Sequence, residues 1–343
     1  MWVWNEGDPH STPPRGSSLN VCLTGGTGSL GRALAAYYLT DPACERIVIL
    51  SRDEQKQAQM ASGLGPRDPA DKLRFFLGDV RDRERLAHAF AHCNTVIHCA
   101  ALKRVDAVAY SPSEARKTNV EGSVNVVAAA LGSGVTRVLM ISSDKAVEPI
   151  NFYGVTKQMM EQEAIASNAI TVPFGLRVSC TRWGNVLGSR GGVVGIFKEA
   201  LRRGDPLPIT DARCTRFWLT LDGAVRYVQR ALEVMEGGEV LVPTGLPAAG
   251  IVDVARAVAP EPYPLAYLGL RAGGEKVHEV LATAAECQRA VERGALMAIP
   301  PEIHPWRVAG WGGTPVGVAA YTSEWAPRMT HDDLVRAVKE IEG

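Results

Sequence analysis

The chain has 343 residues, of which 46% are hydrophobic and 22% charged, and its 37 basic and 37 acidic side chains give a formal net charge of zero. This length predicts one large domain or two closely packed ones. The balanced charge gives no reason to expect nucleic acid or an anionic membrane as a partner, and no apolar run approaches the roughly 20 residues that a membrane span needs.

The first 17 residues are polar and rich in proline, without the basic and apolar regions of a secretory signal. We expect residues 1–17 to be a mobile tail, in which Trp2 and Trp4 are candidates for contact with a partner subunit. The seven cysteines form no C-x-x-C pair and no zinc-ligand spacing. We therefore expect buried free thiols in a reducing cytoplasm and no metal site.

Short apolar strands alternate with helical patterns in the first half of the chain. The spacing predicts strands at Asn20–Leu23, Arg46–Leu50, Arg74–Phe76, Thr95–His98 and Arg137–Ile141, and helices at Ser29–Thr40, Asp82–Ala91, Ser113–Ala130 and Tyr153–Ala166. Ser51–Glu54 and Ser111–Glu114 have capping-box spacing, which is typical of helix starts. The alternation predicts an α/β fold with a Rossmann-type doubly wound parallel sheet.

Glycine and proline clusters interrupt this alternation after about Val178. We expect residues 18–180 to form an NADP-binding Rossmann domain, joined by a returning segment at about 217–253 with a helix near Thr220–Met235. Residues 181–216 and 254–343 are then expected to form a smaller C-terminal substrate-binding lobe.

The segment TGGTGSLG, Thr24–Gly31, lies between the first predicted strand and the first predicted helix. Glycines at this spacing allow a tight turn, a close backbone approach to a pyrophosphate and tight packing of the helix on the strand. The helix N-terminus then faces the anion. We expect a dinucleotide to be held here by Thr24, Gly25, Thr27, Gly28, Ser29, Leu30 and Gly31.

The end of the second predicted strand bears on the choice between NADP and NAD. An acidic residue at this point would bind a ribose hydroxyl and repel a 2′-phosphate, whereas the chain has Ser51 and Arg52, with Lys56 one turn later. Because a guanidinium grips phosphate well, we expect NADP, bound by Ser51, Arg52 and Lys56. The alternative is that Arg52 is solvated and Asp53 binds the ribose of NAD. Further cofactor contacts are expected from Asp79, Val80, Ala100 and Ala101, at the ends of the third and fourth strands.

The segment SSDKAVEPINFYGVTK, Ser142–Lys157, follows the fifth predicted strand, where ligands bind in this fold. Tyr153 and Lys157 share one helix face, and a nearby ammonium lowers the pKa of a tyrosine, about 10 when free, toward that of a general base. A simple hydride transfer needs only the tyrosine–lysine pair. Elimination of water would need a further acid and base, and Asp144 and Lys145 could supply both. We expect Lys157 and the cationic nicotinamide to depress the pKa of Lys145. The alternative is that Asp144 and Lys145 form a surface ion pair.

Several blocks of sequence occur in one order and carry a resemblance that covers about Ser18 to the C-terminus. They are TGGTGSLG, SRDEQKQ, GDVRD, HCAALKRVDAV, SSDKAVEPINFYGVTK, TRWGNVLGSRGGVV, ITDARCTRFWLTLD and GGEKVHEVL. Together they resemble the extended short-chain dehydrogenase/reductase superfamily and, more narrowly, the inverting UDP-N-acetylglucosamine 4,6-dehydratases of pseudaminic acid biosynthesis.

This resemblance implies a reaction in which Tyr153 takes the C4 hydroxyl proton while a hydride passes from C4 to NADP⁺. Lys145 then acts as the base at C5, Asp144 protonates the departing C6 hydroxyl, the hydride returns to C6, and C5 is reprotonated on the opposite face. Ser143 stands where many relatives have threonine and is expected to bind the C4 oxygen. The resemblance also implies a homo-oligomer, a dimer or a hexamer.

A UDP-sugar substrate is implied as well, with its phosphates needing cationic and backbone donors. The expected contacts are Lys103, Asn185, Arg190, Val194, Thr210, Arg216, Arg271 and Glu275. The family usually reads Arg-Pro-Gly-Glu-Lys at the last of these sites, whereas Arg271–Lys276 has one residue more and no proline. We expect Phe217 and Trp218 to belong to the core, and His98 and His278 to be structural.

Three other functions remain open on this reasoning. A dehydratase that retains the C5 configuration would keep the same acid and base. A UDP-sugar 4-epimerase would keep Tyr153 and Lys157 but has no use for Asp144 and Lys145. A non-catalytic NADP-sensing protein would typically lack the tyrosine or the lysine, and both are present here.

Overall fold

The computed structural model describes residues 18–189, 191–259, 261–303, 306, 311–317 and 319–340. The predicted tail with Trp2 and Trp4, and the substrate candidate Arg190, lie outside these residues.

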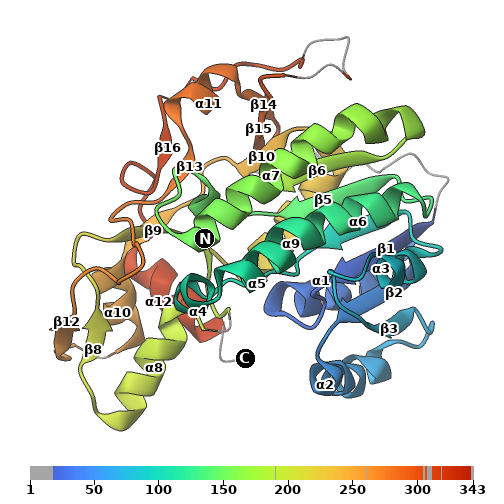
Figure 1. Ribbon diagram of the computed structural model, residues 1–343. Helices are drawn as coiled ribbons and strands as arrows, with labels where there is room; N and C mark the ends of the chain where they lie inside the picture. Colours follow the sequence, from blue (N-terminus) through green and yellow to red (C-terminus); the bar gives the residue numbers. More distant parts are fainter. Residues whose placement is uncertain are drawn as a thin grey trace.

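A nine-stranded sheet, in the order β14-β15-β10-β6-β5-β4-β1-β2-β3, forms the centre of the protein (Figure 1). Neighbouring strands from β3 to β10 run parallel, and β15 and β14 add an antiparallel edge. Because the chain reverses its direction of travel between β1 and β4, the carboxyl ends of these two strands open a crevice for a ligand. The strands are β1 (Leu19–Thr24), β2 (Cys44–Ser51), β3 (Leu73–Leu77), β4 (Thr95–His98), β5 (Arg137–Ile141), β6 (Arg177–Thr181), β10 (Val240–Pro243), β14 (Val291–Arg293) and β15 (Leu296–Ile299).

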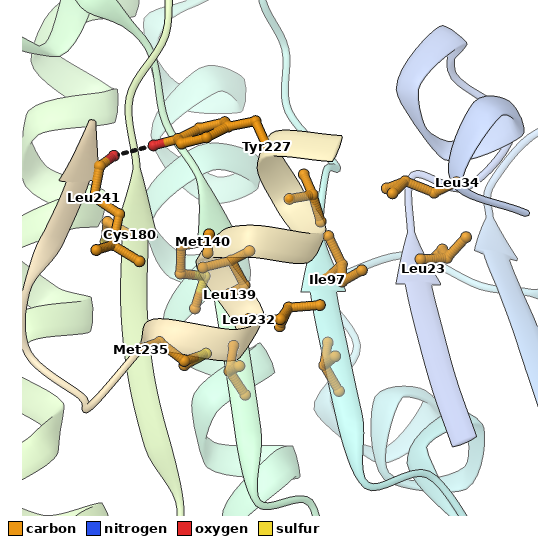
Figure 2. Close-up of a cluster of buried hydrophobic side chains, with 14 of the residues drawn as sticks. Leu23, Leu34, Ile97, Leu139, Met140, Cys180, Tyr227, Leu232, Met235 and Leu241 are labelled. Atoms are coloured by element: carbon orange, nitrogen blue, oxygen red, sulfur yellow. Dashed lines mark hydrogen bonds between the residues drawn. The ribbon is translucent and has the colours of Figure 1, made fainter. Parts of the chain in front are cut away.

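Helices cover both faces of this sheet, so the predicted doubly wound fold is confirmed. Figure 2 shows α9 (Leu221–Val234) on one face, where it packs beside α1 (Ser29–Thr40), with other helices behind the sheet. The other layer contains α3 (Arg83–Phe90), α6 (Gly122–Leu131) and α7 (Phe152–Thr171). The predicted strands and helices of the first half all form, and the predicted helix near Thr220–Met235 is α9.

Two details differ from the capping-box prediction. The helix α2 (Glu54–Leu64) begins where expected, but its N-cap is Asp53, which accepts from the Lys56 backbone N–H at 2.9 Å, and not Ser51. Ser51 instead bonds Thr27 through the two hydroxyl groups, 2.8 Å apart. Ser111 does precede α5 (Pro112–Arg116), but its side chain makes no capping bond.

The core of the sheet consists of short apolar strands that are buried along continuous runs, such as all four residues of β4 and the three central residues of β5. Leu23, Ile97 and Leu139 are fully buried on neighbouring strands, and Leu232 of α9 packs over them in Figure 2. Tyr227 donates its hydroxyl to the Leu241 carbonyl and so joins α9 to β10. This core fixes the strand ends on which the candidate site is built.

The smaller structural elements of the second half lie beside the carboxyl ends of these strands (Figure 1, lower left). Residues such as Phe197, Ile209, Val254 and Leu334 form a separate buried cluster there. The elements are β7 (Asn185–Val186), α8 (Val193–Arg203), β8 (Leu207–Ile209), β9 (Thr215–Leu219), β11 (Ala248–Gly250), α10 (Ile251–Val258), β12 (Leu265–Tyr267) and α12 (His331–Glu340). The strands β13 (Val280–Ala282) and β16 (Tyr321–Thr322) and the helix α11 (Ala284–Arg289) complete this half, which also contributes β14 and β15 to the main sheet.

Candidate active site

A cavity of about 1790 Å³ runs from the glycine loop after β1 to β9. This volume exceeds the roughly 300–1,000 Å³ of a site for one small ligand. The cavity is therefore large enough for a dinucleotide and a second ligand side by side. Most predicted site residues line it: Gly25, Thr27, Gly28, Ser29, Leu30, Gly31, Ser51, Arg52, Lys56, Val80, Ala100, Ala101, Lys103, Ser143, Lys145, Tyr153, Lys157, Asn185, Val194, Thr210, Arg216, Arg271 and Glu275.

Three predicted residues lie behind the cavity wall. Thr24 is buried and its hydroxyl contacts His98 Nδ1 at 2.7 Å. Asp79 accepts from Arg52 and Arg81. Asp144 is fully buried beneath Ser143 and Lys145, which both donate to its Oδ1.

The glycine loop has the shape that a dinucleotide requires. Gly25 has a φ of +64°, and a Cβ there would lie 2.7 Å from the Ala100 Cα. The N-cap of α1 is Gly28, which brings no capping side chain, so backbone donors of the first turn face the cavity. The loop therefore fits the pyrophosphate of a nicotinamide dinucleotide.

The Arg52 guanidinium lines the cavity near α2, with its Nη1 3.3 Å from Asp79 Oδ2. The side chain is about half exposed, so this ion pair holds it weakly. Asp53, the alternative ribose ligand, is engaged as the N-cap of α2 and in an ion pair with Lys56.

The short loop after β5 brings the acid and the base together. Lys145 Nζ lies 3.0 Å from Asp144 Oδ1 and 3.5 Å from Asn185 Oδ1. Ser143 donates its hydroxyl to Asp144 Oδ1 at 2.7 Å. Lys145 therefore lies in the wall of the cavity with Asp144 fully buried behind it, which contradicts the surface-ion-pair alternative.

The expected depression of the Lys145 pKa is wrong. Burial alone would lower this pKa, but the carboxylates of Asp144 and Glu279 outweigh burial and raise it. Lys145 is consequently an ammonium group at neutral pH.

The electrostatics of Tyr153 and Lys157 also differ from expectation. Burial raises the pKa of Tyr153 to about 12, while Lys145 and a hydrogen bond from Ser143 oppose this rise. Lys157 donates its Nζ to the Ile141 carbonyl at 2.5 Å, and burial lowers its own pKa to about 8. The cation that acts on Tyr153 is therefore Lys145, and the expected effect of Lys157 is not seen.

Glu279 is the site residue that sequence reasoning missed. Its carboxylate is buried, lines the cavity and lies 3.5 Å from Lys145 Nζ. It comes just before β13, more than a hundred residues after Lys145 in the chain, so no local spacing signals the contact. The only signal is its place within the block GGEKVHEVL.

The segment Arg271–Lys276, called the strap below, packs against the loop between β5 and α7. Its extra residue is accommodated by Gly273 and Gly274, with φ values of +92° and +101°. Gly274 accepts from Asn151 Nδ2 at 3.1 Å, and Lys276 donates to the Val147 carbonyl. Arg271 still reaches the cavity despite the insertion.

Two predicted substrate contacts of opposite charge bind each other. Arg216 Nη2 donates to Glu275 Oε1 at 2.9 Å, and both side chains are largely buried. Lys103 lines the cavity, and burial lowers its pKa. Trp218 is buried but also lines the cavity, whereas Phe217 belongs to the core as expected.

The two histidines are held by the fold. His98 contacts Thr24 and Ser123, and burial lowers its pKa to about 3, so it is neutral. His278 Nδ1 contacts the Thr215 hydroxyl at 2.8 Å. All seven cysteines are free thiols, and the part of the chain that the structure describes has no metal-binding cluster of His, Cys, Asp and Glu.

Among the described residues, no helix is both long and apolar enough to span a membrane.

The fold and the site define an extended short-chain dehydrogenase/reductase, a class of enzymes that use a nicotinamide cofactor. Residues 21–301 match the family model described as "Polysaccharide biosynthesis protein". The chain belongs to this family.

Characterised relatives cover most of the chain. It is 41% identical over 285 residues, 83% of each chain, to a UDP-N-acetylglucosamine 4,6-dehydratase (inverting) of Campylobacter jejuni. It is 34% identical over 94% of each chain to a UDP-glucose 4-epimerase of Rickettsia prowazekii. Among solved structures, Pen from Bacillus thuringiensis superposes with a TM-score of 0.86 at 26% identity, over 95% of this chain and 98% of that one.

Proposed function

We propose that this protein is a UDP-N-acetylglucosamine 4,6-dehydratase that inverts C5 and gives UDP-2-acetamido-2,6-dideoxy-β-L-arabino-hexos-4-ulose. The observation that carries the proposal is the 3.0 Å contact between Lys145, which lines the cavity together with Tyr153, and Asp144, which is buried directly behind it. The 41% identity to the Campylobacter dehydratase supports the same substrate.

The Tyr153 phenolate is the group that accepts the C4 hydroxyl proton, and the Lys145 ammonium stabilises this phenolate. Lys157 lies one turn further on α7, where its ammonium is placed to bind the cofactor ribose. The bound cofactor supplies the hydride acceptor for C4 and the hydride donor for C6. Oxidation at C4 makes the C5 hydrogen acidic enough for a lysine base.

Elimination needs Lys145 as an amine and Asp144 as a carboxylic acid at the same time. One proton moved from Lys145 Nζ to Asp144 Oδ1, across their hydrogen bond, produces both forms without a change in net charge. Lys145 then takes the C5 proton, and Asp144 passes its proton through the Ser143 hydroxyl, which lines the cavity 2.7 Å from Asp144 Oδ1, to the C6 hydroxyl, which leaves as water. After this step the pair is again an ammonium and a carboxylate.

We propose NADP as the cofactor, with Arg52 and Lys56 at its 2′-phosphate, backed by Ser51. The support is that Arg52 and Lys56 line the cavity while Asp53 is already used as the cap of α2. For the substrate we propose phosphate contacts from Arg190, Arg216 and Arg271, with the remaining predicted contacts around the sugar and the uridine.

We also propose the division into an NADP-binding domain and a substrate-binding lobe, and a cytoplasmic homo-oligomer, either a dimer or a hexamer. The seven free thiols support a reducing compartment. Exposed apolar side chains, including Tyr110, Ile170 and Phe174, support contact between subunits. Sedimentation equilibrium counts the subunits.

The test uses purified protein with UDP-N-acetylglucosamine in deuterated water, followed by NMR of the product. We expect a 4-keto-6-deoxy sugar with deuterium at C5. The coupling constants of the remaining ring protons should correspond to the inverted configuration at C5. Lys145→Ala should lower elimination by about 100-fold or more, while oxidation at C4, followed as reduced nicotinamide, should fall by less, because Lys145 only assists Tyr153 in that step. Tyr153→Phe is the matched control, and it should lose both steps.

The 34% identity to the Rickettsia enzyme makes 4-epimerisation the second candidate. An epimerase would give the C4 epimer with no deuterium at C5, and Lys145→Ala would leave its rate nearly unchanged. Deuterium at C5 with retained configuration would instead indicate a retaining dehydratase. No change of any UDP-sugar would favour a non-catalytic protein.

A further inference from the structure

The acid–base pair has a second carboxylate beside it. Glu279 Oε1 lies 3.5 Å from Lys145 Nζ and 3.8 Å from Arg216 Nε. Its Oε2 is buried without a hydrogen-bond donor, 3.9 Å from Lys276 Nζ. Since a buried carboxylate is costly unless it interacts with cations, this position favours the ammonium of Lys145, the nearest of its three cations.

Charged and titratable groups face Lys145 from every side. Asp144 comes from the same loop, Tyr153 from α7, Arg216 from β9, and Lys276 from the strap. Arg216 and Lys276, the two other cations near Glu279, disfavour a positive charge on Lys145, whereas the carboxylates of Asp144 and Glu279 favour it. Asp144 is neutral while it acts as an acid, so Glu279 is then the carboxylate that remains within 4 Å of Lys145.

We propose that Glu279 is a positioning residue that keeps one proton on the Asp144–Lys145 pair, so that the pair always carries the proton that Asp144 must deliver. If the pair lost this proton to solvent, it would be an amine beside a carboxylate, and the C6 hydroxyl would have no acid. The proposal deepens, and in its catalytic meaning rests on, the dehydratase function proposed above.

The test is Glu279→Gln, which keeps the shape of the side chain and removes its charge. Acetylation of Lys145 by an N-hydroxysuccinimide ester is measured by mass spectrometry of its peptide, from about pH 7 to about pH 11. Because the Lys145 pKa is raised above its ordinary value, we take as the midpoint of reactivity the pH at which acetylation reaches one fixed rate. This pH should fall by about one unit or more in the variant, as for loss of an opposite charge within 4–6 Å. The matched control is Glu286→Gln, which removes a carboxylate paired with Arg182 at 2.9 Å on α11, away from Lys145. It should not move the midpoint.

The same variants are then compared in catalysis. In Glu279→Gln the alkaline limb of kcat for elimination should move down by about the same one unit. Oxidation at C4, followed as reduced nicotinamide in a single turnover, measures separately the effect that a change in Lys145 has on Tyr153. Glu279→Asp, which retains the charge, should restore most of the wild-type midpoint.

An unchanged Lys145 midpoint in folded Glu279→Gln overturns the proposal. If that variant does not fold, the proposal is overturned when Lys145 of the wild type titrates no higher than Lys103, whose pKa burial lowers. A shifted midpoint in a protein that dehydrates no UDP-sugar would support the charge assignment and defeat the proposed function. Dehydration with an unshifted midpoint would defeat only the role of Glu279.

Discussion

At the scale of single residues, Arg52 and Arg81 offer a matched comparison at the cofactor site. Both guanidinium groups bind Asp79 Oδ2, at 3.3 Å and 2.7 Å, and both side chains are partly exposed. Only Arg52 lines the cavity, and Arg81 is also paired with Glu114 at 2.8 Å. The two residues therefore differ in access to a ligand and not in chemistry.

We predict that Arg52→Ala weakens NADP binding by roughly tenfold to a hundredfold, because a charge-assisted contact to phosphate contributes about 1.5–3 kcal/mol. NAD has no 2′-phosphate, so its affinity should change little. Isothermal titration calorimetry with both dinucleotides measures the difference.

Arg81→Ala is the control, and it should affect both dinucleotides only slightly. Equal affinity of the wild type for NAD and NADP, with neither changed by Arg52→Ala, would show that this arginine does not select the cofactor.

The sequence identifies the reactive side chains at this scale but not their charge states. Tyr153, Lys157 and the Asp144–Lys145 pair follow from motif and spacing; the first two and Lys145 line the cavity, Asp144 lies behind it, and their roles stay predictions. The direction of the Lys145 pKa depends on Glu279, which only the fold brings within 3.5 Å. Burial of Tyr153 is likewise a property of packing, so its pKa of about 12 is not predictable from an i, i+4 lysine.

At the scale of elements, the start of α7 is joined to the strap of the other half. Asn151 caps the helix by accepting from the Gly154 backbone N–H at 2.9 Å, and its Nδ2 donates to the Gly274 carbonyl. Gly274 packs so closely that a Cβ would lie 2.2 Å from the Ile150 carbonyl oxygen. One side chain thus positions the helix turn that carries Tyr153.

We predict that Asn151→Ala lowers the free energy of unfolding by about 1–2 kcal/mol, the usual cost of a lost N-cap. It should also lower kcat/KM by roughly tenfold to a hundredfold, because Tyr153 loses its fixed position. Urea denaturation and steady-state kinetics measure the two effects.

Asp82→Ala removes the comparable N-cap of α3, which accepts from the Arg85 backbone N–H at 2.9 Å. This variant should lower the free energy of unfolding by a similar amount, about 1–2 kcal/mol, but should change kcat/KM only slightly. Equal catalytic losses in the two variants would mean that the cap acts only through global stability.

Helix and strand positions in the first half were predictable because their periodicity is strong. The internal geometry of one helix was not. The predicted helix Ser113–Ala130 contains a π-helical turn at Lys117–Glu121. Within it, Asn119 bonds the Leu102 backbone and the Thr156 hydroxyl. Such a turn depends on partners in the loop after β4 and in α7, which the helix propensities of its own residues do not indicate.

At the scale of the whole molecule, Arg182 joins elements from both halves of the chain. It follows β6, bonds Glu161 of α7 with Nε and Nη2, and reaches Glu286 of α11 at 2.9 Å. Its Nη1 donates to the Leu281 carbonyl of β13 at 3.2 Å. Because Glu161 lies one turn beyond Lys157, this cluster supports the catalytic helix from behind.

We predict that Arg182→Met lowers the free energy of unfolding by about 3–5 kcal/mol, because the fully buried Glu161 carboxylate loses its cation. The control is Arg202→Met, which breaks a pair with Glu199 on the exposed face of α8 and should cost less than about 1 kcal/mol. Urea denaturation, followed by circular dichroism, measures both.

If the two variants lost similar, small amounts of stability, the cluster would not hold the halves together. If Arg182→Met alone is strongly destabilised, and Arg182→Met with Glu161→Gln recovers part of the loss, the uncompensated carboxylate is the cause.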